Sequence, residues 1–343
     1  MGRCKIFIYA LNEDNISIKG EGVIDLSGES FFDFSKTLNP IENIDLLTPE
    51  QIEETEAKPL ERPNQPIFFY NCKNLTIENV TFKDSPCWTI SINSSEGIRI
   101  RGIKIINNLR IPNSDGVHLC SCRDVSISEC KFVCGDDCIA LTGITNWDKP
   151  CENVMISDCF METRSAGVRI GHLDSKVQDV KIKNLIISNS NRGIGIFANG
   201  SKGYVKNIYI SNVIADTHIY AGTWWGKGEP LVIQAPESGN FIEDIKIENL
   251  IARSENGIVI WGKDRNIRNV ELRNVLIGIS YGKNRELFGR YIDLQPSGFQ
   301  ELKEYKSYIP WVILKSVENF NYSDVLYYKE SSDKVYSIEK LEL

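Results

Sequence analysis

A short sequence pattern recurs along most of this chain and constrains its fold more than any other feature. Asn or Asp precedes an apolar–polar–apolar triplet, and a second short alternation follows, as in NLTIENVTF from Asn74 and DIKIENLIA from Asp244. The first apolar positions are spaced by 23 to 37 residues. They are Leu75, Ile98, Val125, Val154, Val180, Ile208, Ile245 and Val270. A period of this length indicates a solenoid or a propeller.

The content of each repeat favours a parallel β-helix. The units contain several short strands with period-2 alternation and almost no helical periodicity. The fixed leucine lattice of leucine-rich repeats is absent, and a propeller blade needs about 40 residues. We therefore expect an all-β protein of about ten coils stacked about 4.8 Å apart. The asparagines before the triplets are expected to form ladders at the turns, because Asn tolerates the left-handed backbone conformation.

No linker is visible, so we expect one domain over residues 1–343, with three departures from the regular period. Residues 36–66 form an insert, in which Thr48 followed by a proline and acidic residues predicts a short helix. Residues 217–229 lengthen one repeat with a Trp-rich segment. Residues 283–343 lose the period, and we expect them to form a last irregular coil and a cover for the open end.

Composition and charge exclude several classes of protein. Of the 343 residues, 42% are hydrophobic and 25% are charged, which is typical of a folded protein. A net charge of −7 argues against a nucleic-acid partner, and no apolar run approaches the ~20 residues that cross a membrane. No signal peptide is visible from Met1 to Ala10, so we expect a cytoplasmic protein unless a leader was removed. The first coil begins close to Met1, and its uncapped edge predicts a homo-oligomer.

Ten cysteines raise the question of disulfides or a metal site. They are Cys4, Cys72, Cys87, Cys120, Cys122, Cys130, Cys134, Cys138, Cys151 and Cys159. The chain has no CxxC pair and only three histidines, so we expect neither a metal nor another cofactor. Free thiols that serve as small buried hydrophobic groups are the better interpretation, and they fit a reducing compartment.

A second strand in each coil brings charged residues together. The segments SDGVHLC from Ser114, DDCIALT from Asp136 and SAGVRIG from Ser165 align on their apolar pairs, which form two inward columns. In this register Asp115 and Asp137 share an outward column on neighbouring coils, and Asp136 lies beside Asp137. His118 and Arg169 lie one column along. Carboxylates this close raise each other's pKa, which points to a metal or to acid–base chemistry.

Three motifs resemble the polygalacturonase family, glycoside hydrolase family 28. They are NSDGVH at 113–118, GDDC at 135–138 and DSPCWTI at 84–90, and the resemblance covers roughly residues 5–280. It implies a right-handed parallel β-helix that cleaves glycosidic bonds of pectin with inversion. Inversion needs carboxyl groups ~6.5–9.5 Å apart, which neighbouring coils can supply.

The resemblance also implies roles for individual residues. Asp136 would be the general acid. Asp115 and Asp137 would position and deprotonate the attacking water, and Asn113 would support the site.

The substrate-reading motifs of the family are altered here. Its Gly-His-Gly motif falls on Ser165-Ala166-Gly167, and its Arg-Ile-Lys motif, which grips a uronate, falls on Gly195-Ile196-Phe197. Arg169 lies in the missing arginine's column one coil earlier, and Arg192 lies at the edge of the same face. Either Arg169 or Arg192 replaces the residues that bind the uronate carboxylate, or the bound sugar is neutral. The alternative role for Arg169 is to pair with one of the aspartates.

Several other residues are candidate substrate contacts. Trp224 and Trp225 cannot both face inward on a strand, so they form either a wall that stacks on sugars or a packing contact with the short helix. His172 stands in a Gly-His-Leu sequence that mimics the lost motif. The remaining candidates are His118, Phe197, Glu229 and Trp261.

Three functions remain open. The leading one is a glycoside hydrolase acting on a pectin-type or related oligosaccharide. A pectate-lyase-like eliminase would instead hold Ca²⁺ on the aspartates and use Arg169 as the base. The third is a non-catalytic carbohydrate-binding β-helix, against which the retention of all three aspartates argues. Metal dependence separates the first two functions, and any turnover excludes the third.

Overall fold

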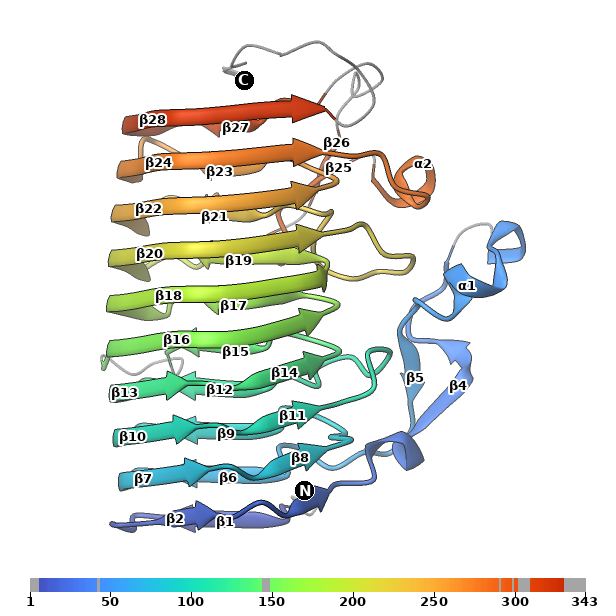
Figure 1. The fold of residues 1–343 in the computed structure, drawn as a ribbon, viewed down its shortest axis with the longest axis vertical. Helices are drawn as coiled ribbons and strands as arrows, with labels where there is room; N and C mark the ends of the chain where they lie inside the picture. Colours follow the sequence, from blue (N-terminus) through green and yellow to red (C-terminus); the bar gives the residue numbers. More distant parts are fainter. Residues whose placement is uncertain are drawn as a thin grey trace.

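The computed structural model describes residues 6–41, 44–143, 149–289, 291–297, 299–301 and 309–329. Its coils stack along one axis, with the described chain starting at one end of the stack and finishing at the other (Figure 1). Neighbouring coils pair through parallel strands in two long sheets. The all-β parallel β-helix predicted from the repeat is therefore confirmed.

The first sheet has ten strands, one from each coil. In spatial order they are β1 (Ile8–Leu11), β6 (Ile67–Tyr70), β9 (Ile90–Asn93), β12 (Val117–Cys120), β15 (Ile139–Thr142), β17 (Ala166–Ile170), β19 (Arg192–Phe197), β21 (Leu231–Ala235), β23 (Ile258–Gly262) and β27 (Val312–Lys315). The pairing aligns Val117 with Ile139 and Ile139 with Val168. These side chains are buried, so the predicted inward column is confirmed.

The second sheet has fourteen strands and carries the Asn-initiated repeats. Its path is β2 (Ser17–Lys19), β7 (Lys73–Glu78), β10 (Glu96–Arg101), β13 (Arg123–Ser128), β16 (Cys151–Thr163), β18 (Lys176–Ser190), β20 (Tyr204–Thr217), β22 (Phe241–Ser254), β24 (Ile267–Ile279) and β28 (Val317–Lys329). Four short strands lie beside that path: β3 (Val23–Asp25), β8 (Thr81–Lys83), β11 (Lys104–Ile106) and β14 (Lys131–Cys134).

Ladders of Asn and Asp side chains join the turns of successive coils, as the repeat predicts. Asn207 donates its side-chain amide to Asp179 on the preceding coil, at 2.9 Å. Asn212 donates in the same way to Asn184 at 3.0 Å, and Asn249 donates to Asn212 at 2.8 Å. All five residues adopt the left-handed backbone conformation, with φ between 55° and 58°. The side chains therefore stabilise a turn that few other residues accept.

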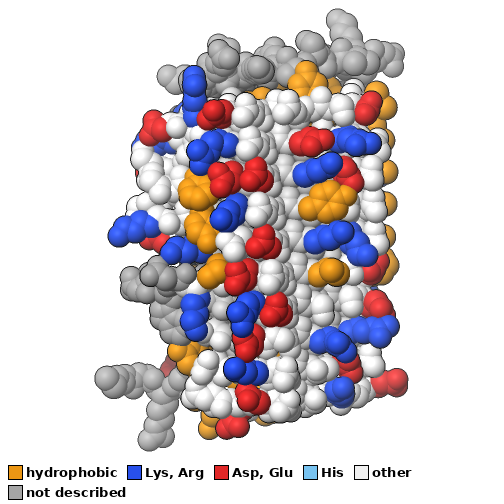
Figure 2. All heavy atoms as spheres, turned by 90° about the vertical axis from the view of Figure 1, so that its left-hand side faces the viewer, with side chains coloured by type: hydrophobic (Ala, Val, Ile, Leu, Met, Phe, Trp, Pro, Cys, Tyr) orange, Lys and Arg blue, Asp and Glu red, His pale blue; other side chains and the backbone are white. Residues whose placement is uncertain are grey.

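Acidic and basic side chains alternate in rows on one face of the stack (Figure 2). The strand register gives one such row, which only the neutral Gln178 interrupts: Lys73, Glu96, Arg123, Glu152, Gln178, Lys206, Glu243, Arg268 and Glu318. Lys73 pairs with Glu96 at 3.1 Å, and Arg268 pairs with Glu243 at 3.2 Å. Opposite charges across neighbouring strands favour this register over a slipped one.

One hydrophobic core fills the interior of the coils and includes most of the cysteines. All nine described cysteines are free, and all except Cys87 are buried. The prediction of buried free thiols is therefore confirmed for eight of them and not for Cys87, which is half-buried, whereas Cys4 lies outside the described residues. The helices among the described residues are single turns, none of them long enough to cross a membrane.

The insert between the first two coils stands away from the stack (Figure 1). It contains η1 (Gly28–Phe31), η2 (Ile44–Leu46), α1 (Pro49–Ile52) and an antiparallel hairpin of β4 (Phe32–Thr37) and β5 (Ala57–Pro59). It begins before residue 36, the expected boundary, because β4 already leaves the coil. Helix α1 is the one predicted from Thr48, whose hydroxyl accepts a hydrogen bond from the Gln51 N–H in a capping box.

The C-terminal part is more regular than the sequence predicts. After α2 (Arg285–Phe288) and the short pair β25 (Tyr291–Asp293) and β26 (Phe299–Glu301), strands β27 and β28 continue both sheets. Phe320 continues the inward column of Val270. The cover expected over the last coil falls on residues outside the described ones.

Candidate active site

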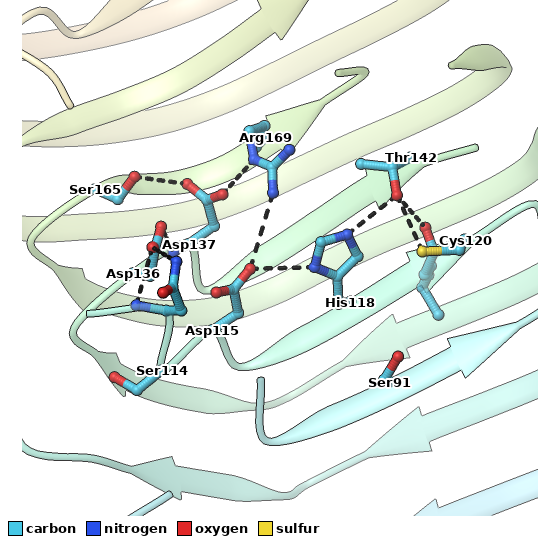
Figure 3. A network of polar contacts seen from close by, with 12 residues as sticks. Ser91, Ser114, Asp115, His118, Cys120, Asp136, Asp137, Thr142, Ser165 and Arg169 are labelled. Carbon is cyan, nitrogen blue, oxygen red and sulfur yellow. Dashed lines mark hydrogen bonds and ion pairs between the residues drawn. The ribbon is translucent and has the colours of Figure 1, made fainter. Parts of the chain in front are cut away.

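Three carboxylates meet where two neighbouring strands of the ten-stranded sheet begin. Asp115 lies two residues before β12, and Asp136 and Asp137 lie just before β15. One carboxylate oxygen from each lies within 4.8 Å of those from the other two. Figure 3 shows the three side chains converging beside Arg169 and His118. The clustering predicted from the strand register is therefore confirmed, and we call these residues the cleft carboxylates.

The turns before both strands fold tightly enough to require glycine. A Cβ on Gly116 would lie 2.3 Å from the Cys138 carbonyl oxygen on the next coil. The Gly116 N–H donates to the Asp137 carbonyl at 2.9 Å. The Ser114 hydroxyl accepts from the Gly135 N–H at 2.9 Å. These contacts fix the two aspartate-bearing turns relative to each other, which explains why Ser-Asp-Gly and Gly-Asp-Asp occur together.

Among the three carboxylates, Asp137 has the closest contact with a positively charged group. Its carboxylate pairs with the Arg169 guanidinium and accepts from the Ser165 hydroxyl at 2.9 Å and the Ala166 N–H at 3.1 Å. Burial alone would raise its pKa. The charge and hydrogen bond of Arg169, with the bonds from Ser165 and Ala166, outweigh burial and hold the pKa of Asp137 below its usual range. Asp137 is therefore the member that ionises first.

Asp136 has the opposite electrostatic environment. It is half-buried, and it accepts from the Asn113 backbone and side-chain nitrogens at 3.2 and 3.4 Å and from the Asp137 N–H at 2.9 Å. Burial, followed by the negative charges of Asp115 and Asp137, raises the pKa of Asp136 well above its usual range. No cation pairs with it among the described residues. Asp136 therefore keeps its proton while Asp137 is charged.

Asp115 is almost completely buried, with 1% of its surface exposed. Its Oδ2 contacts His118 Nδ1 at 3.2 Å, whereas its Oδ1 is buried and has no hydrogen-bond partner among the described residues. Burial and the charge of Asp137 raise the pKa of Asp115 well above its usual range. A buried acceptor without a donor is costly, so it marks a place where a bound group would be stabilised.

The carboxylates lie closer together than the sequence comparison led us to expect. Separations of ~6.5–9.5 Å are typical of inverting glycosidases, whereas the nearest oxygens here lie within 4.8 Å. The reason is that Asp136 and Asp137 are adjacent in one turn, and Asp115 is only one coil away. Separation alone therefore does not identify the stereochemical course.

The carboxylates open into a cleft of about 450 Å³, a volume suited to a small ligand. Its lining comes from the turns and ends of the ten-stranded sheet, from the insert and from the 217–229 loop. The lining residues are Leu38, Asn39, Glu56, Trp88, Pro112, Asn113, Asp115, His118, Cys120, Asp136, Asp137, Thr142, Gly143, Ser165, Arg169, His172, Leu173, Asp174, Ser175, Thr223, Trp224 and Trp225.

His118 is held in place by residues that the sequence did not single out. Its ring stacks on Trp88, with centroids 3.7 Å apart, and its Nε2 contacts the Thr142 hydroxyl at 3.0 Å. Trp88 belongs to the DSPCWTI motif, and Thr142 shares the outward column of Cys120. Thr142 could therefore have been identified as a cleft residue from the column alignment. Glu56 also lines the cleft, but the alignment could not identify it, because Glu56 belongs to the insert.

Arg169 faces the cleft, but its guanidinium is already paired. It contacts Asp137 through Nε and Asp115 through an Nη at 3.8 Å, and its side chain is only 12% exposed. Of the two roles considered for it, pairing with the aspartates is the one that the structure shows. His172 also lines the cleft, and burial, together with the charge of Arg169, lowers its pKa to about 4. His172 is therefore neutral near pH 7.

Two predicted substrate contacts, Arg192 and Glu229, are wrong. Arg192 is 3% exposed, Glu229 is fully buried, and neither lines the cleft. The Arg192 guanidinium lies 3.5 Å from Glu229 and 3.8 Å from Asp293. Asp293 accepts from the Gly226 N–H, and Glu229 accepts from the Lys227 N–H at 2.7 Å. These three charged residues, which we call the buried ion cluster, fix the 217–229 loop to the C-terminal part of the chain.

Phe197 and Trp261 are also wrong as substrate contacts. The strand register places both outward, as predicted. They are nevertheless buried, because Ile292 and Leu294 cover this part of the ten-stranded sheet and form a second hydrophobic cluster with them. The position at which the resemblance implies a uronate-binding lysine is therefore occupied by Phe197 and covered by the protein's own side chains.

The two tryptophans have different environments. Trp224 is buried, and its Nε1 donates to the Glu54 carbonyl at 2.8 Å, so it packs against the segment that follows α1. Trp225 is 41% exposed, and its ring lies 6.5 Å from that of His172. Both line the cleft. The prediction that the pair does not belong to the coil core is correct. Trp224 shows the packing alternative, whereas stacking of a sugar on Trp225 stays a prediction.

The cleft carboxylates fit a calcium ion poorly. Calcium takes six to eight oxygen ligands, whereas Asp137 already accepts from Arg169, Ser165 and Ala166. The Arg169 guanidinium also supplies positive charge to two of the three carboxylates. A cation beside it would be repelled, which disfavours the eliminase alternative.

Comparisons with known proteins agree with this geometry. The model of glycosyl hydrolases family 28 matches residues 2–287. A probable polygalacturonase of Vitis vinifera is 32% identical over 165 residues, covering 45% of this chain and 33% of the relative. A polygalacturonase of Juniperus ashei is 24% identical over 311 residues, covering 85% of this chain and 57% of the relative. The matches thus span about a third to just over half of these curated relatives.

Solved structures share the fold at low sequence identity. An exopolygalacturonase of Thermotoga maritima superimposes with a TM-score of 0.66 at 21% identity, covering 94% of this chain and 71% of that one. A polygalacturonase of Erwinia carotovora gives 0.56 at 17% identity, covering 98% and 73%. Both are right-handed parallel β-helices, which confirms the predicted hand.

Proposed function

This chain belongs to glycosyl hydrolases family 28, and from that premise we propose that it hydrolyses a glycosidic bond of a pectin-type oligosaccharide. The observation that carries the proposal is the opposite displacement of two neighbouring carboxyl pKa values. The pKa of Asp136 is raised and that of Asp137 is lowered. Such a pair supplies an acid and a base at the same pH.

Asp136 is the proposed general acid. It is the least buried of the cleft carboxylates, and its environment keeps it protonated. It donates its proton to the glycosidic oxygen as the bond to the anomeric carbon breaks, so the leaving sugar departs as an alcohol. Asn113 contacts one Asp136 oxygen and is itself held by Arg62, whose guanidinium donates to the Asn113 side-chain oxygen at 2.8 Å.

Asp115 and Asp137 are the proposed water-activating pair. Asp137 is ionised and can take a proton from water, while the unpaired Oδ1 of Asp115 offers a second acceptor. The water oxygen bonds to the anomeric carbon, and its proton moves to Asp137. Exchange of protons with solvent then restores both carboxyl groups.

The burial of this pair favours inversion. A retaining glycosidase needs a carboxylate oxygen that can bond to the anomeric carbon. Asp115 and Asp137 are 1% and 2% exposed, so both lie too deep to bond to a sugar ring, and the proposed nucleophile is water. Attack by water in a single displacement inverts the configuration at that carbon.

Two further predictions from the sequence stay as proposals. We propose that the protein acts in the cytoplasm on imported oligosaccharides, and that its N-terminal edge pairs with a second copy. Strands β1 and β2 are the edge strands of the two long sheets, which supports the second proposal.

An activity screen tests the proposed function. The purified protein is incubated with oligogalacturonides, rhamnogalacturonan fragments and neutral pectic oligosaccharides, with and without EDTA. We expect new reducing ends with at least one acid or neutral substrate, no absorbance near 235 nm, and less than a twofold effect of EDTA. Unsaturated products that need added Ca²⁺ would instead establish the eliminase, and no turnover on any substrate would contradict catalysis.

A further inference from the structure

The outer face of the ten-stranded sheet is open on some coils and covered on others. Strands β12, β15 and β17 contribute residues to the cleft, whereas β19, β21 and β23 contribute none. On those later strands the outward residues Phe197, Val232 and Trp261 are buried beneath Ile292 and Leu294. The cleft therefore stops at the boundary between β17 and β19.

The 217–229 loop forms a wall at this boundary. Trp225 reaches His172, which follows β17, and the two ring centroids are 6.5 Å apart. Asn191, just before β19, donates its side-chain amide to the Trp225 carbonyl at 3.3 Å. Thr223 and Trp224 continue the wall along the cleft. The loop thus crosses the end of the cleft from the insert to His172.

The wall is locked to the insert by hydrogen bonds. Glu56 is 3% exposed and accepts from the Thr223 N–H at 2.9 Å and from the Thr223 hydroxyl at 2.7 Å. Asn39 donates to the same hydroxyl at 2.9 Å, and Trp224 donates to the Glu54 carbonyl at 2.8 Å. These four hydrogen bonds join the loop directly to the insert, so they leave no gap between the two through which an oligosaccharide could pass.

Two supports on the far side hold the wall in place. The Asn284 side chain donates to the Ile219 carbonyl of the loop at 2.7 Å and to Glu54 of the insert at 2.6 Å. The buried ion cluster ties Gly226 and Lys227 to Asp293 and Glu229. The wall is therefore attached to the insert, to the α2 segment and to the cover over Phe197.

We propose that the wall makes the cleft blind, so that the enzyme removes a short piece of fixed length from a chain end. The inference rests on the proposed hydrolytic function. Asp137 precedes β15, and the covered strand β19 is only two coils further, a distance of about 10 Å. This leaves room for a short terminal segment between the carboxylates and the wall, but no path for a continuing chain.

The length distribution of the first products tests this inference. The probes are oligogalacturonides and rhamnogalacturonan fragments of defined length, used both unlabelled and labelled at the reducing end with 2-aminobenzamide. We expect one short product size from the earliest time points, and a remaining chain that shortens stepwise. An early mixture of intermediate lengths would overturn the inference while leaving hydrolysis intact, whereas no cleavage of any probe would contradict the proposed function itself.

A matched pair of variants tests the wall directly. Trp225→Ala removes an exposed part of the wall, and Phe160→Ala removes another exposed aromatic ring, from the outer face of the other sheet. We expect Trp225→Ala to add longer products to the early mixture and Phe160→Ala to keep the single size. An unchanged product size in folded Trp225→Ala would contradict the role of the wall.

Discussion

The cleft carboxylates and the buried ion cluster are both groups of acidic residues around one arginine, yet they have different consequences. In the cleft, Arg169 pairs with Asp115 and Asp137 but not with Asp136. In the buried ion cluster, Arg192 meets Glu229 and Asp293, and the backbone N–H groups of the 217–229 loop supply further bonds. The first group faces a cleft, whereas the second is sealed from solvent.

The comparison shows that the role of such a group depends less on the number of carboxylates per arginine than on location. What matters is whether a carboxyl group without a cationic partner faces a cleft. Asp136 is half-buried beside a cleft, so its raised pKa leaves a proton available to a ligand. Glu229 and Asp293 do not line the cleft, and they serve to fix a loop. Substitutions among the cleft carboxylates should therefore lower turnover, whereas substitutions in the buried ion cluster should lower stability.

The largest effect is expected from Asp136→Asn. The amide cannot donate the proton that the leaving group needs, so kcat should fall by at least ~10². The side chain lies outside the coil core, so the midpoint of thermal unfolding should stay within a few degrees of the parent value. Steady-state kinetics and calorimetry measure both quantities. A folded variant with near-normal turnover would show that the acid lies elsewhere.

The next largest effect is expected from Arg192→Met, and it concerns stability. Removing the arginine leaves Glu229 and Asp293 buried without a charge partner, which should cost about 3–5 kcal/mol of unfolding free energy. Denaturant unfolding measures this cost. As a control, the double variant Arg192→Met/Glu229→Gln should recover part of the loss, because one buried charge is then removed. Full stability of the single variant would mean that the cluster does not fix the loop.

A smaller effect, on pH dependence, is expected from Arg169→Met. The arginine lowers the pKa of Asp137, so without it that carboxyl group binds its proton at higher pH. Activity requires Asp137 ionised and Asp136 protonated. The acid limb of the kcat/KM profile should therefore move to higher pH, with a loss of about tenfold at the parent optimum.

The same variant distinguishes pairing from substrate binding. A pairing role predicts equal losses of kcat/KM on an acidic substrate and on its esterified analogue. Arg169→Lys, which keeps the charge, should recover part of the acid limb. A loss confined to the acidic substrate would show that Arg169 contacts a uronate after all.

The sequence predicted the coils and the clustering of the carboxylates because both depend on a local period. The alternation around Val117, Ile139 and Val168 fixes which side chains face inward, and a slip by one residue would bury Asp115 or Asp137 in the core. The outward positions of Phe197 and Trp261 were correct for the same reason.

The repeat does not predict which residues cover the outward positions of the ten-stranded sheet. Ile292 and Leu294 belong to a segment without the repeat, and they pack on residues about 30 to 100 positions earlier in the chain. Arg192 and Asp293 are likewise brought together only by the full stack of coils. Non-repetitive segments that fold back over a repeat leave no periodic signal, so the roles predicted for Arg192, Glu229, Phe197 and Trp261 were wrong.

The configuration of the first product tests the central claim, that Asp136 acts as an acid while Asp115 and Asp137 activate water. Proton NMR of the anomeric signals, recorded before mutarotation, gives this configuration directly for the substrate with the highest turnover. The account predicts a reducing-end anomer opposite to that of the cleaved bond, because the two carboxylates are too buried to bond to the sugar ring. A retained configuration would mean that a carboxylate bonds to the sugar, and would contradict the account.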